Sequence, residues 1–150
     1  MSIRSSKADK HGALWQAGTI TVLALAMTAF GIAGVQRPAS VDELRIPIEE
    51  LNSDAAELAL LRAERSAGRV SDNFYDAHLR QLARSQADSY RDLTRLQVRP
   101  ALMPLKMEAV GEGQALARYL TLLREGEDLD EAALQRIRAR LDVLARDLRS

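Results

Sequence analysis

The sequence of 150 residues contains no cysteine, so disulfide bonds, thiolate metal ligands and cysteine nucleophiles are excluded. Histidine is almost as scarce. Of the two histidines, only His78 lies outside the N-terminal tail, and it has no second imidazole with which to share a zinc ion or a haem iron. We therefore expect no metal site and no cofactor.

An excess of charge of one sign is missing as well, because 21 basic and 21 acidic residues give a formal net charge of zero. No overall field attracts nucleic acid. No convergent acid, base and nucleophile stand out, and Gly111-Glu112-Gly113 lacks the strand and helix that flank a phosphate-binding loop. The carboxylates between Glu125 and Glu131 do not follow the spacing of an EF-hand. We expect neither an enzyme nor a protein that binds nucleic acid.

What the sequence does contain is a long uncharged run, from Ala13 to Val35, which follows a basic tail. At 1.5 Å per residue, a helix of this length reaches about 35 Å and can cross a hydrocarbon core of about 30 Å. Trp15 lies at the start of the run, where an indole ring suits the headgroup level, and Pro38 follows its end. The run predicts a transmembrane helix or signal anchor at 13–35.

The orientation of this helix follows from the basic tail, residues 1–12, because positive residues beside a membrane span favour the cytoplasm. The expected product is a single-pass protein of the cell membrane, with a linker at 36–41 and an extracytoplasmic domain at 42–150. In the alternative, the run is a secretory signal that is cleaved at Gly31 or Ala33 and releases the domain to the periplasm. Both interpretations place the domain outside the cytoplasm.

Beyond the linker, apolar residues recur at three- and four-residue spacing, which is typical of amphipathic helices. Ser40 and Glu43 have the spacing of a capping box at the first helix start, and Pro47 fits the first turn. Asp128 and Glu131 repeat the capping-box spacing before the last helix. The helices are expected at about 42–67, 72–97, 105–124 and 129–148.

Glycine and proline divide these helices into pairs. Gly68 and Gly126 each follow a helix end, and prolines bracket a break at 99–104. The predicted fold is all-α: the transmembrane helix precedes two antiparallel hairpins, 42–98 and 105–149, which pack as an up-down four-helix bundle. In the alternative, the hairpins stay apart and each buries its apolar face on another protein.

Two polar residues, Gln86 and Ser89, interrupt the apolar seam of the second predicted helix. Polar residues at such positions fix the register against a neighbouring helix or mark a buried water. The last predicted helix has no such interruption, because leucine and isoleucine keep a strict spacing from Leu134 to Leu148. This is the clearest packing seam in the chain.

An arginine stripe follows the opposite face of the second predicted helix. Its members, within an arc of about 100°, are Arg80, Arg84, Arg91, Arg95 and Arg99. The stripe is a candidate interaction surface for anionic lipid headgroups or an acidic partner. Asp76, Asp88 and Asp92 lie three or four residues from an arginine, which favours instead the ordinary pairing of a solvated helix face.

Two short segments resemble known families. The segment from Leu93 to Gln97 resembles the LTxxQ pattern of periplasmic stress chaperones of the Spy and CpxP type, which are small helical hairpin dimers. The turn from Ala67 to Ser71, followed by Phe74, is similar to that of the short helical hairpins called SHOCT domains. The first pattern occurs once and at a helix end, so no residue roles are carried over from either family.

A membrane anchor and paired apolar seams without catalytic residues indicate a protein that acts by contact. We expect an accessory or scaffold subunit of an envelope assembly, held in the membrane through residues 13–35 and bound to a protein partner or to copies of itself. The alternative is an exported helical chaperone or stress sensor that binds unfolded chains or ions.

Overall fold

The computed structural model describes residues 37–149, which form four long helices and one short one. Their bounds are α2 (Val41–Ser66), α3 (Asp72–Arg95), the 3-10 helix η1 (Pro100–Leu102), α4 (Met103–Arg124) and α5 (Glu131–Asp147). The basic tail and the span expected at 13–35 lie outside the described residues. Among the helices that are described, none is long and apolar enough to cross a membrane.

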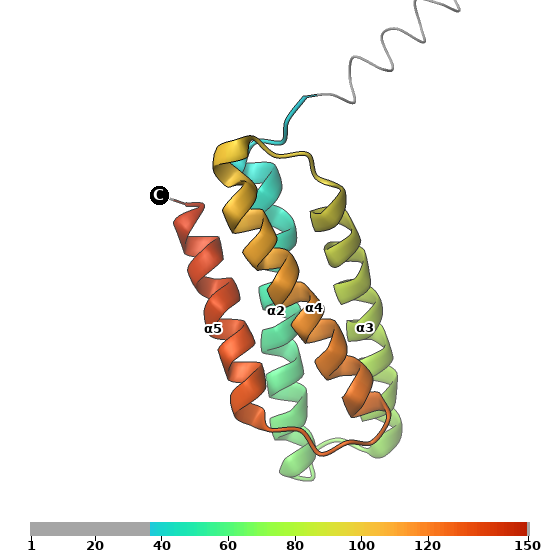
Figure 1. Cartoon of the computed structure of the whole chain (residues 1–150). Coiled ribbons are helices and arrows are strands. Elements are labelled where there is room, and N and C mark those ends of the chain that lie inside the picture. Colours follow the sequence, from blue (N-terminus) through green and yellow to red (C-terminus); the bar gives the residue numbers. More distant parts are fainter. Residues whose placement is uncertain (1–36, 150) are drawn as a thin grey trace, which may run out of the picture. The chain divides into compact units, whose positions relative to one another are not determined.

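The four long helices form one antiparallel bundle (Figure 1). Each helix packs on the next in sequence, and α5 closes the bundle by packing on α2. The contact of α3 with α4 and that of α5 with α2 join the two hairpins, so they do not stay apart. We name the two ends by their place in Figure 1. The upper end holds the start of α2, the segment 96–102 and the end of α5, and the lower end holds the turns 67–71 and 125–130.

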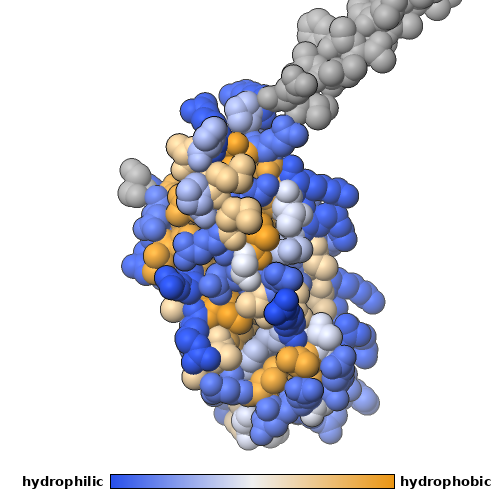
Figure 2. All heavy atoms as spheres, in the orientation of Figure 1, coloured by the Kyte–Doolittle hydropathy of each residue, from blue (hydrophilic) through white to orange (hydrophobic). Residues whose placement is uncertain are grey.

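The core lies along the axis between the four helices and is built mostly of leucine. Figure 2 shows hydrophilic side chains over much of the outer face, with apolar ones exposed between them. The largest side chains with almost no exposed surface are Leu44, Ile48, Leu51, Leu58, Leu79, Leu93, Leu116, Leu134, Leu141 and Leu144. Burial of each such side chain contributes about 1.5–3 kcal/mol, which makes this seam the main source of stability.

The first hairpin begins and turns with the predicted caps. The Ser40 hydroxyl accepts from the Glu43 backbone N–H at 3.2 Å, and the Glu43 carboxylate accepts from the Ser40 N–H at 2.6 Å. Gly68 follows α2 with a φ of 68°. Its N–H donates to the Arg65 carbonyl, and the Arg69 N–H donates to the Glu64 carbonyl, both at 2.9 Å. These two hydrogen bonds close the end of α2 and direct the chain into α3.

Pro47 was expected in a first helical turn, and this expectation is wrong. The capping box at Ser40 starts α2 at Val41, so Pro47 lies inside the helix with its ring buried. Proline has no N–H to donate within a helix, and its ring widens the turn before it. The apolar ring at this position nevertheless contributes to the wall of a surface hollow described below.

The capping box expected at Asp128 is also wrong, because Asp130 caps α5 by accepting from the Ala132 N–H at 2.9 Å. α5 begins later than predicted, because two side chains donate hydrogen bonds to carbonyls of the residues that precede it. Arg62 donates to the Leu129 carbonyl at 2.9 Å, and the Tyr119 hydroxyl donates to the Asp130 carbonyl at 3.3 Å. These bonds hold the connection across the lower end of the bundle.

The polar residue Gln86 fixes the register of α3 against α4. Its amide Nε2 is buried and donates to the Gly113 carbonyl at 2.9 Å. Gly113 allows the close approach, because a Cβ there would lie 2.9 Å from Tyr90 Cδ2 and 3.2 Å from Leu51 Cδ1. Of the two roles expected for a polar residue in this seam, Gln86 therefore fixes the register against a neighbouring helix.

Candidate interaction surface on α2 and α3

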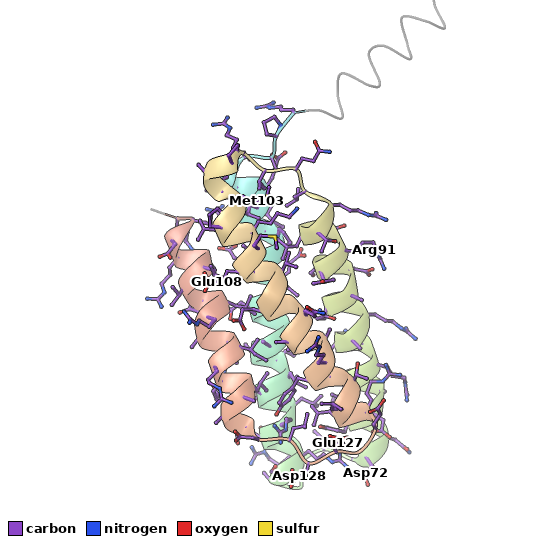
Figure 3. The ribbon with its side chains drawn as sticks, viewed as in Figure 1. Asp72, Arg91, Met103, Glu108, Glu127 and Asp128 are labelled. Atoms are coloured by element: carbon purple, nitrogen blue, oxygen red, sulfur yellow. The ribbon has the colours of Figure 1, made fainter. Side chains whose placement is uncertain are left out.

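All five residues of the arginine stripe are exposed, but they do not all lie on one helix. Arg80, Arg84, Arg91 and Arg95 lie on α3, and Figure 3 shows Arg91 on its outer side. Arg99 lies beyond the helix, because α3 ends at Arg95 and the chain is extended before η1. The arginine stripe was expected to continue along one helix to Arg99, but only four of its five residues lie on α3.

Ion pairs neutralise little of this stripe. Arg91 Nη1 lies 2.6 Å from Asp88 Oδ1, and both side chains are solvent-exposed. Within residues 37–149 this is the only ion pair made by the stripe, so the expected pairs of Asp76 and Asp92 with their neighbouring arginines are absent. An exposed pair of this kind contributes about 0–1 kcal/mol. The stripe thus presents mostly unpaired guanidinium groups.

Beside the stripe, a hollow of about 390 Å³ opens between the first turns of α2 and the last turn of α3. Ile46, Pro47 and Leu96 give it an apolar wall, and Arg95 lies at its margin. Ile46 is 53% exposed, so its side chain is available for contact with another molecule at this hollow. The hollow therefore offers an apolar contact site that the bundle itself does not fill.

A second hollow, of about 430 Å³, continues along the same two helices and shares Glu50 and Asp92 with the first. Carboxylate and hydroxyl side chains line it. The remaining residues around it are Ser53, Asp54, Ser85, Asp88 and Ser89. We call the two together the α2–α3 hollow. It has an apolar upper part and an acidic lower part.

Polar side chains on α3 meet the acidic side chains of α2 along this interface. Ser85 Oγ donates to Asp54 Oδ1 at 2.9 Å, and Ser89 Oγ donates to Glu50 Oε2 at 3.0 Å. Toward the lower end, His78 Nε2 lies 2.6 Å from a carboxylate oxygen of Glu57. These contacts fix the two helices side by side and hold the carboxylates in place.

Asp54 is the least solvated of these carboxylates, with only 7% of its surface exposed. Its Oδ2 atom is buried and has no hydrogen-bond partner within the described residues. The pKa of Asp54 is raised from 3.8 to about 6, mainly by burial and to a smaller extent by the carboxylates of Glu57 and Glu50, against the opposing hydrogen bond from Ser85. A buried, incompletely bonded carboxylate favours a cationic or donating group beside it.

A third hollow, of about 280 Å³, lies at the lower end between α2, α3 and the turn after α4. Arg62 and Arg65 line it together with Glu127 and Asp128, and Figure 3 shows both carboxylates in this turn. Arg62 also donates to the Tyr119 hydroxyl, and Arg65 lies 4.0 Å from the centre of the Tyr75 ring. Both arginines thus contact side chains of the bundle itself, so we assign this hollow a structural role in supporting the turn.

The carboxylates are not arranged as metal ligands. Among residues 37–149, no three histidine, aspartate or glutamate side chains are close enough together to hold a metal ion. This includes the acidic turn between α4 and α5 and the α2–α3 hollow. With its apolar upper part and its acidic lower part, the α2–α3 hollow can recognise a cationic organic group or a hydrogen-bond donor that also has an apolar portion.

Sequence reasoning found the arginine stripe and missed the α2–α3 hollow. Glu50 and Asp54 lie one turn apart on one helix, and Ser85 and Ser89 lie one turn apart on the next. Matching polar positions on consecutive helices of a hairpin are the signal that points to such a contact. Comparison with known proteins adds no family: no family model matches the chain, and neither a curated protein nor a solved structure does.

Proposed function

We propose that this chain is a single-pass membrane protein of the bacterial envelope whose helical domain acts by contact, as an accessory or scaffold subunit. The observation that carries the proposal is the α2–α3 hollow. It combines an apolar wall with a buried carboxylate, Asp54, whose Oδ2 is unbonded within residues 37–149. A protein partner can supply an apolar side chain for the wall and a charged donor for the carboxylate, since the two commonly lie side by side on one segment.

The partner is a protein segment that presents an apolar side chain next to a lysine or arginine. The apolar side chain packs against Ile46, Pro47 and Leu96, and the cation approaches the lower carboxylates. A buried oxygen without a partner costs about 1–3 kcal/mol, and a charged donor from the partner offsets this cost. The unpaired arginines of α3 beside the hollow repel cations elsewhere on this face and so restrict the register of binding.

The proposed membrane topology rests on residues 13–35 as an uncleaved anchor with a cytoplasmic N-terminus. Extraction of membranes with alkaline carbonate, followed by mass measurement of the intact chain, tests it. The proposal expects the full-length chain to stay in the membrane pellet. A soluble chain that begins after Gly31 or Ala33 would instead identify a cleaved signal and a periplasmic domain.

The contact function is tested by crosslinking in cells that express variants of the hollow. Ile46→Ser removes the apolar wall, and Asp54→Asn removes the buried charge. Val143→Ser is the matched control, because Val143 is a 41% exposed aliphatic residue of α5 outside the hollow. The proposal expects a stoichiometric complex that either hollow variant weakens by about tenfold, which corresponds to about 1.4 kcal/mol, while the control keeps it. A complex that survives both hollow variants would refute it.

A chaperone or stress sensor is the second candidate, favoured by the large apolar side chains that the bundle exposes. Leu60 and Phe74 are 62% and 53% exposed near the lower end, away from the α2–α3 hollow. Suppression of the aggregation of an unrelated unfolded protein separates the two functions. A scaffold subunit leaves such a client unprotected, whereas protection that is lost in Leu60→Ser would favour the chaperone.

A further inference from the structure

Large apolar side chains that are exposed in residues 37–149 gather toward one end of the bundle. Besides Ile46, which lines the hollow, three of the seven lie within the first two turns of α2 and α4 at the upper end: Val41, Met103 and Met107. Figure 2 shows apolar side chains over the start of α4 in this region, and Figure 3 places Met103 there. Monomeric soluble proteins rarely gather exposed apolar side chains in this way unless the patch has a binding role.

The backbone at the upper end is fixed rather than loose. The Ala39 N–H donates to the Gln97 carbonyl at 2.6 Å and ties the start of the bundle to the segment 96–102. Lys106 Nζ donates to the carbonyls of Thr94 and Leu96, at 3.0 and 2.6 Å, and so satisfies the end of α3. The exposed apolar side chains of this end are therefore presented on an ordered surface.

Charge distinguishes the two ends. The connecting segments of the upper end, 37–40 and 96–102, contain Arg37 and Arg99, both exposed, and no acidic residue. At the lower end, the connection 125–130 has four acidic residues and no basic one, and Arg69 in the turn 67–71 is paired with Glu64 at 2.6 Å. The acidic residues of the upper end, Asp42 and Glu43, lie in the first turn of α2 rather than in a connecting segment. A surface that combines arginine with methionine and valine complements anionic headgroups above an apolar layer, because guanidinium groups bind phosphate in two-point contacts.

The chain that precedes the described residues joins the bundle at the upper end. Between the uncharged run, which ends at Val35, and the first residue of α2 lie only five residues. Five extended residues span at most about 18 Å, so an anchor at 13–35 keeps the upper end within this distance of the bilayer. The lower end is a full helix length further along the bundle.

We propose that the upper end of the bundle binds the surface of an anionic phospholipid bilayer. Arg37 and Arg99 contact headgroup phosphates, while Val41, Met103 and Met107 enter the interface between headgroups and acyl chains. The inference rests on the anchor in the proposed function and adds to it, because it orients the bundle. The α2–α3 hollow then faces sideways, parallel to the membrane plane, where a neighbouring envelope protein reaches it.

The absence of native cysteine makes a direct test possible with the full chain in vesicles of phosphatidylethanolamine and phosphatidylglycerol. Met107→Cys and Leu60→Cys each provide one site for an environment-sensitive fluorophore. The positions are matched, since Met107 is 60% exposed and Leu60 is 62% exposed. We expect lipids with a quencher at headgroup depth to quench position 107 about fivefold more strongly than position 60. Equal quenching at the two positions would overturn the proposal.

The anionic requirement is tested on the same labelled chain. Replacement of phosphatidylglycerol by phosphatidylcholine, or the double variant Arg37→Gln/Arg99→Gln, lowers the quenching at position 107 by about two- to threefold. Arg124→Gln/Arg136→Gln removes the same charge from two exposed arginines nearer the lower end and leaves the quenching unchanged. Quenching that is indifferent to lipid charge would refute recognition of anionic headgroups.

Two further outcomes separate this inference from the function on which it rests. A fluorophore at position 107 that is shielded from water but not quenched by lipid is covered by protein, which overturns lipid binding and leaves contact through the hollow standing. A full-length chain that does not float with the vesicles refutes the anchor and this inference together. The crosslinked complex and its dependence on Ile46 are measured independently of both.

Discussion

The two hairpins of the bundle differ in what they bury. The buried polar and charged residues among 37–149 are Asp54, Gln86 and Ser89, and all three belong to α2 and α3. The buried side chains of α4 and α5 are apolar apart from the Tyr119 hydroxyl, which Arg62 contacts. Both hairpins bury large apolar side chains, but only the first also buries carboxylate, amide and serine hydroxyl groups, and their burial offsets part of the stability that its apolar side chains provide.

The largest expected effect is the loss of a leucine from the second hairpin. Leu141 has no exposed surface, so Leu141→Ala removes buried apolar contacts and leaves a cavity. The free energy of unfolding falls by about 2–5 kcal/mol, measured by denaturation in urea. Val143→Ala on the exposed face of the same helix is the control, and an equal loss there would contradict the assignment of stability to the buried seam.

The second prediction concerns Asp54, the charged residue of the first hairpin. Its pKa is about 6 in the folded state and 3.8 in the absence of the fold, so the folded chain binds more protons between these values. This group therefore favours the folded state most below pH 3.8, and that contribution is lost as the pH rises through 6. A difference of two pKa units corresponds to about 3 kcal/mol.

Asp54→Asn, which cannot ionise, removes this dependence on pH. At pH 7.5 the variant unfolds with a larger free energy than the natural chain, and the difference shrinks as the pH approaches 4. Urea denaturation at a series of pH values measures it. A variant that is less stable than the natural chain at pH 7.5, with the same pH dependence, would show that Asp54 is well solvated or already paired.

The third prediction compares two glycines of α4, one of which faces the first hairpin. Gly113→Ala places a Cβ against Tyr90 and Leu51 and lowers the free energy of unfolding by about 1–2 kcal/mol. Gly111→Ala meets no atom within 4 Å and raises it by about 0.5–1 kcal/mol, because alanine favours the helix. Thermal unfolding of the two variants distinguishes them by sign. Stabilisation by both would mean that α3 and α4 are not closely packed at Gly113.

The smallest effect is expected on the outer face of the first hairpin. Arg84 is exposed and makes no ion pair within the described part of the chain, so Arg84→Gln changes the free energy of unfolding by less than about 0.5 kcal/mol. Denaturation in urea measures it against the natural chain. A loss above about 1 kcal/mol would mean that the arginine stripe supports the fold rather than faces solvent or a partner.

Much of the fold was predictable, because apolar spacing determines which face of each helix is buried. The predicted seam residues from Leu134 to Leu144 are buried in α5, as is Leu148 directly after it, and the glycine caps at Gly68 and Gly126 have positive φ. The prediction of a helical bundle is confirmed. The start predicted for the last helix near Asp128 was wrong, since side chains distant in sequence, such as Arg62, decide where that helix begins. The start of α2 was predicted correctly, but Pro47 lies inside the helix and not in its first turn.

The candidate site was less predictable, because it depends on pairing between helices. Spacing within one helix identified the arginine stripe along α3, but the contact of Asp54 with Ser85, 31 residues away, is indicated only when polar positions are compared between α2 and α3. The hollow also depends on Pro47 lying inside α2, where the sequence pattern did not place it. The predictions for residues 1–36 lie outside the described structure and stay predictions.

The central claim, that the first hairpin carries the contact surface, is tested most directly by photo-crosslinking in living cells. A photoreactive amino acid replaces Ile46 in the hollow or, in a separate strain, Val143 on α5, both exposed aliphatic positions. The account predicts one discrete adduct from position 46, identified by mass spectrometry, and none of comparable yield from position 143. Equal adducts from both positions, or an adduct from position 143 alone, would contradict it.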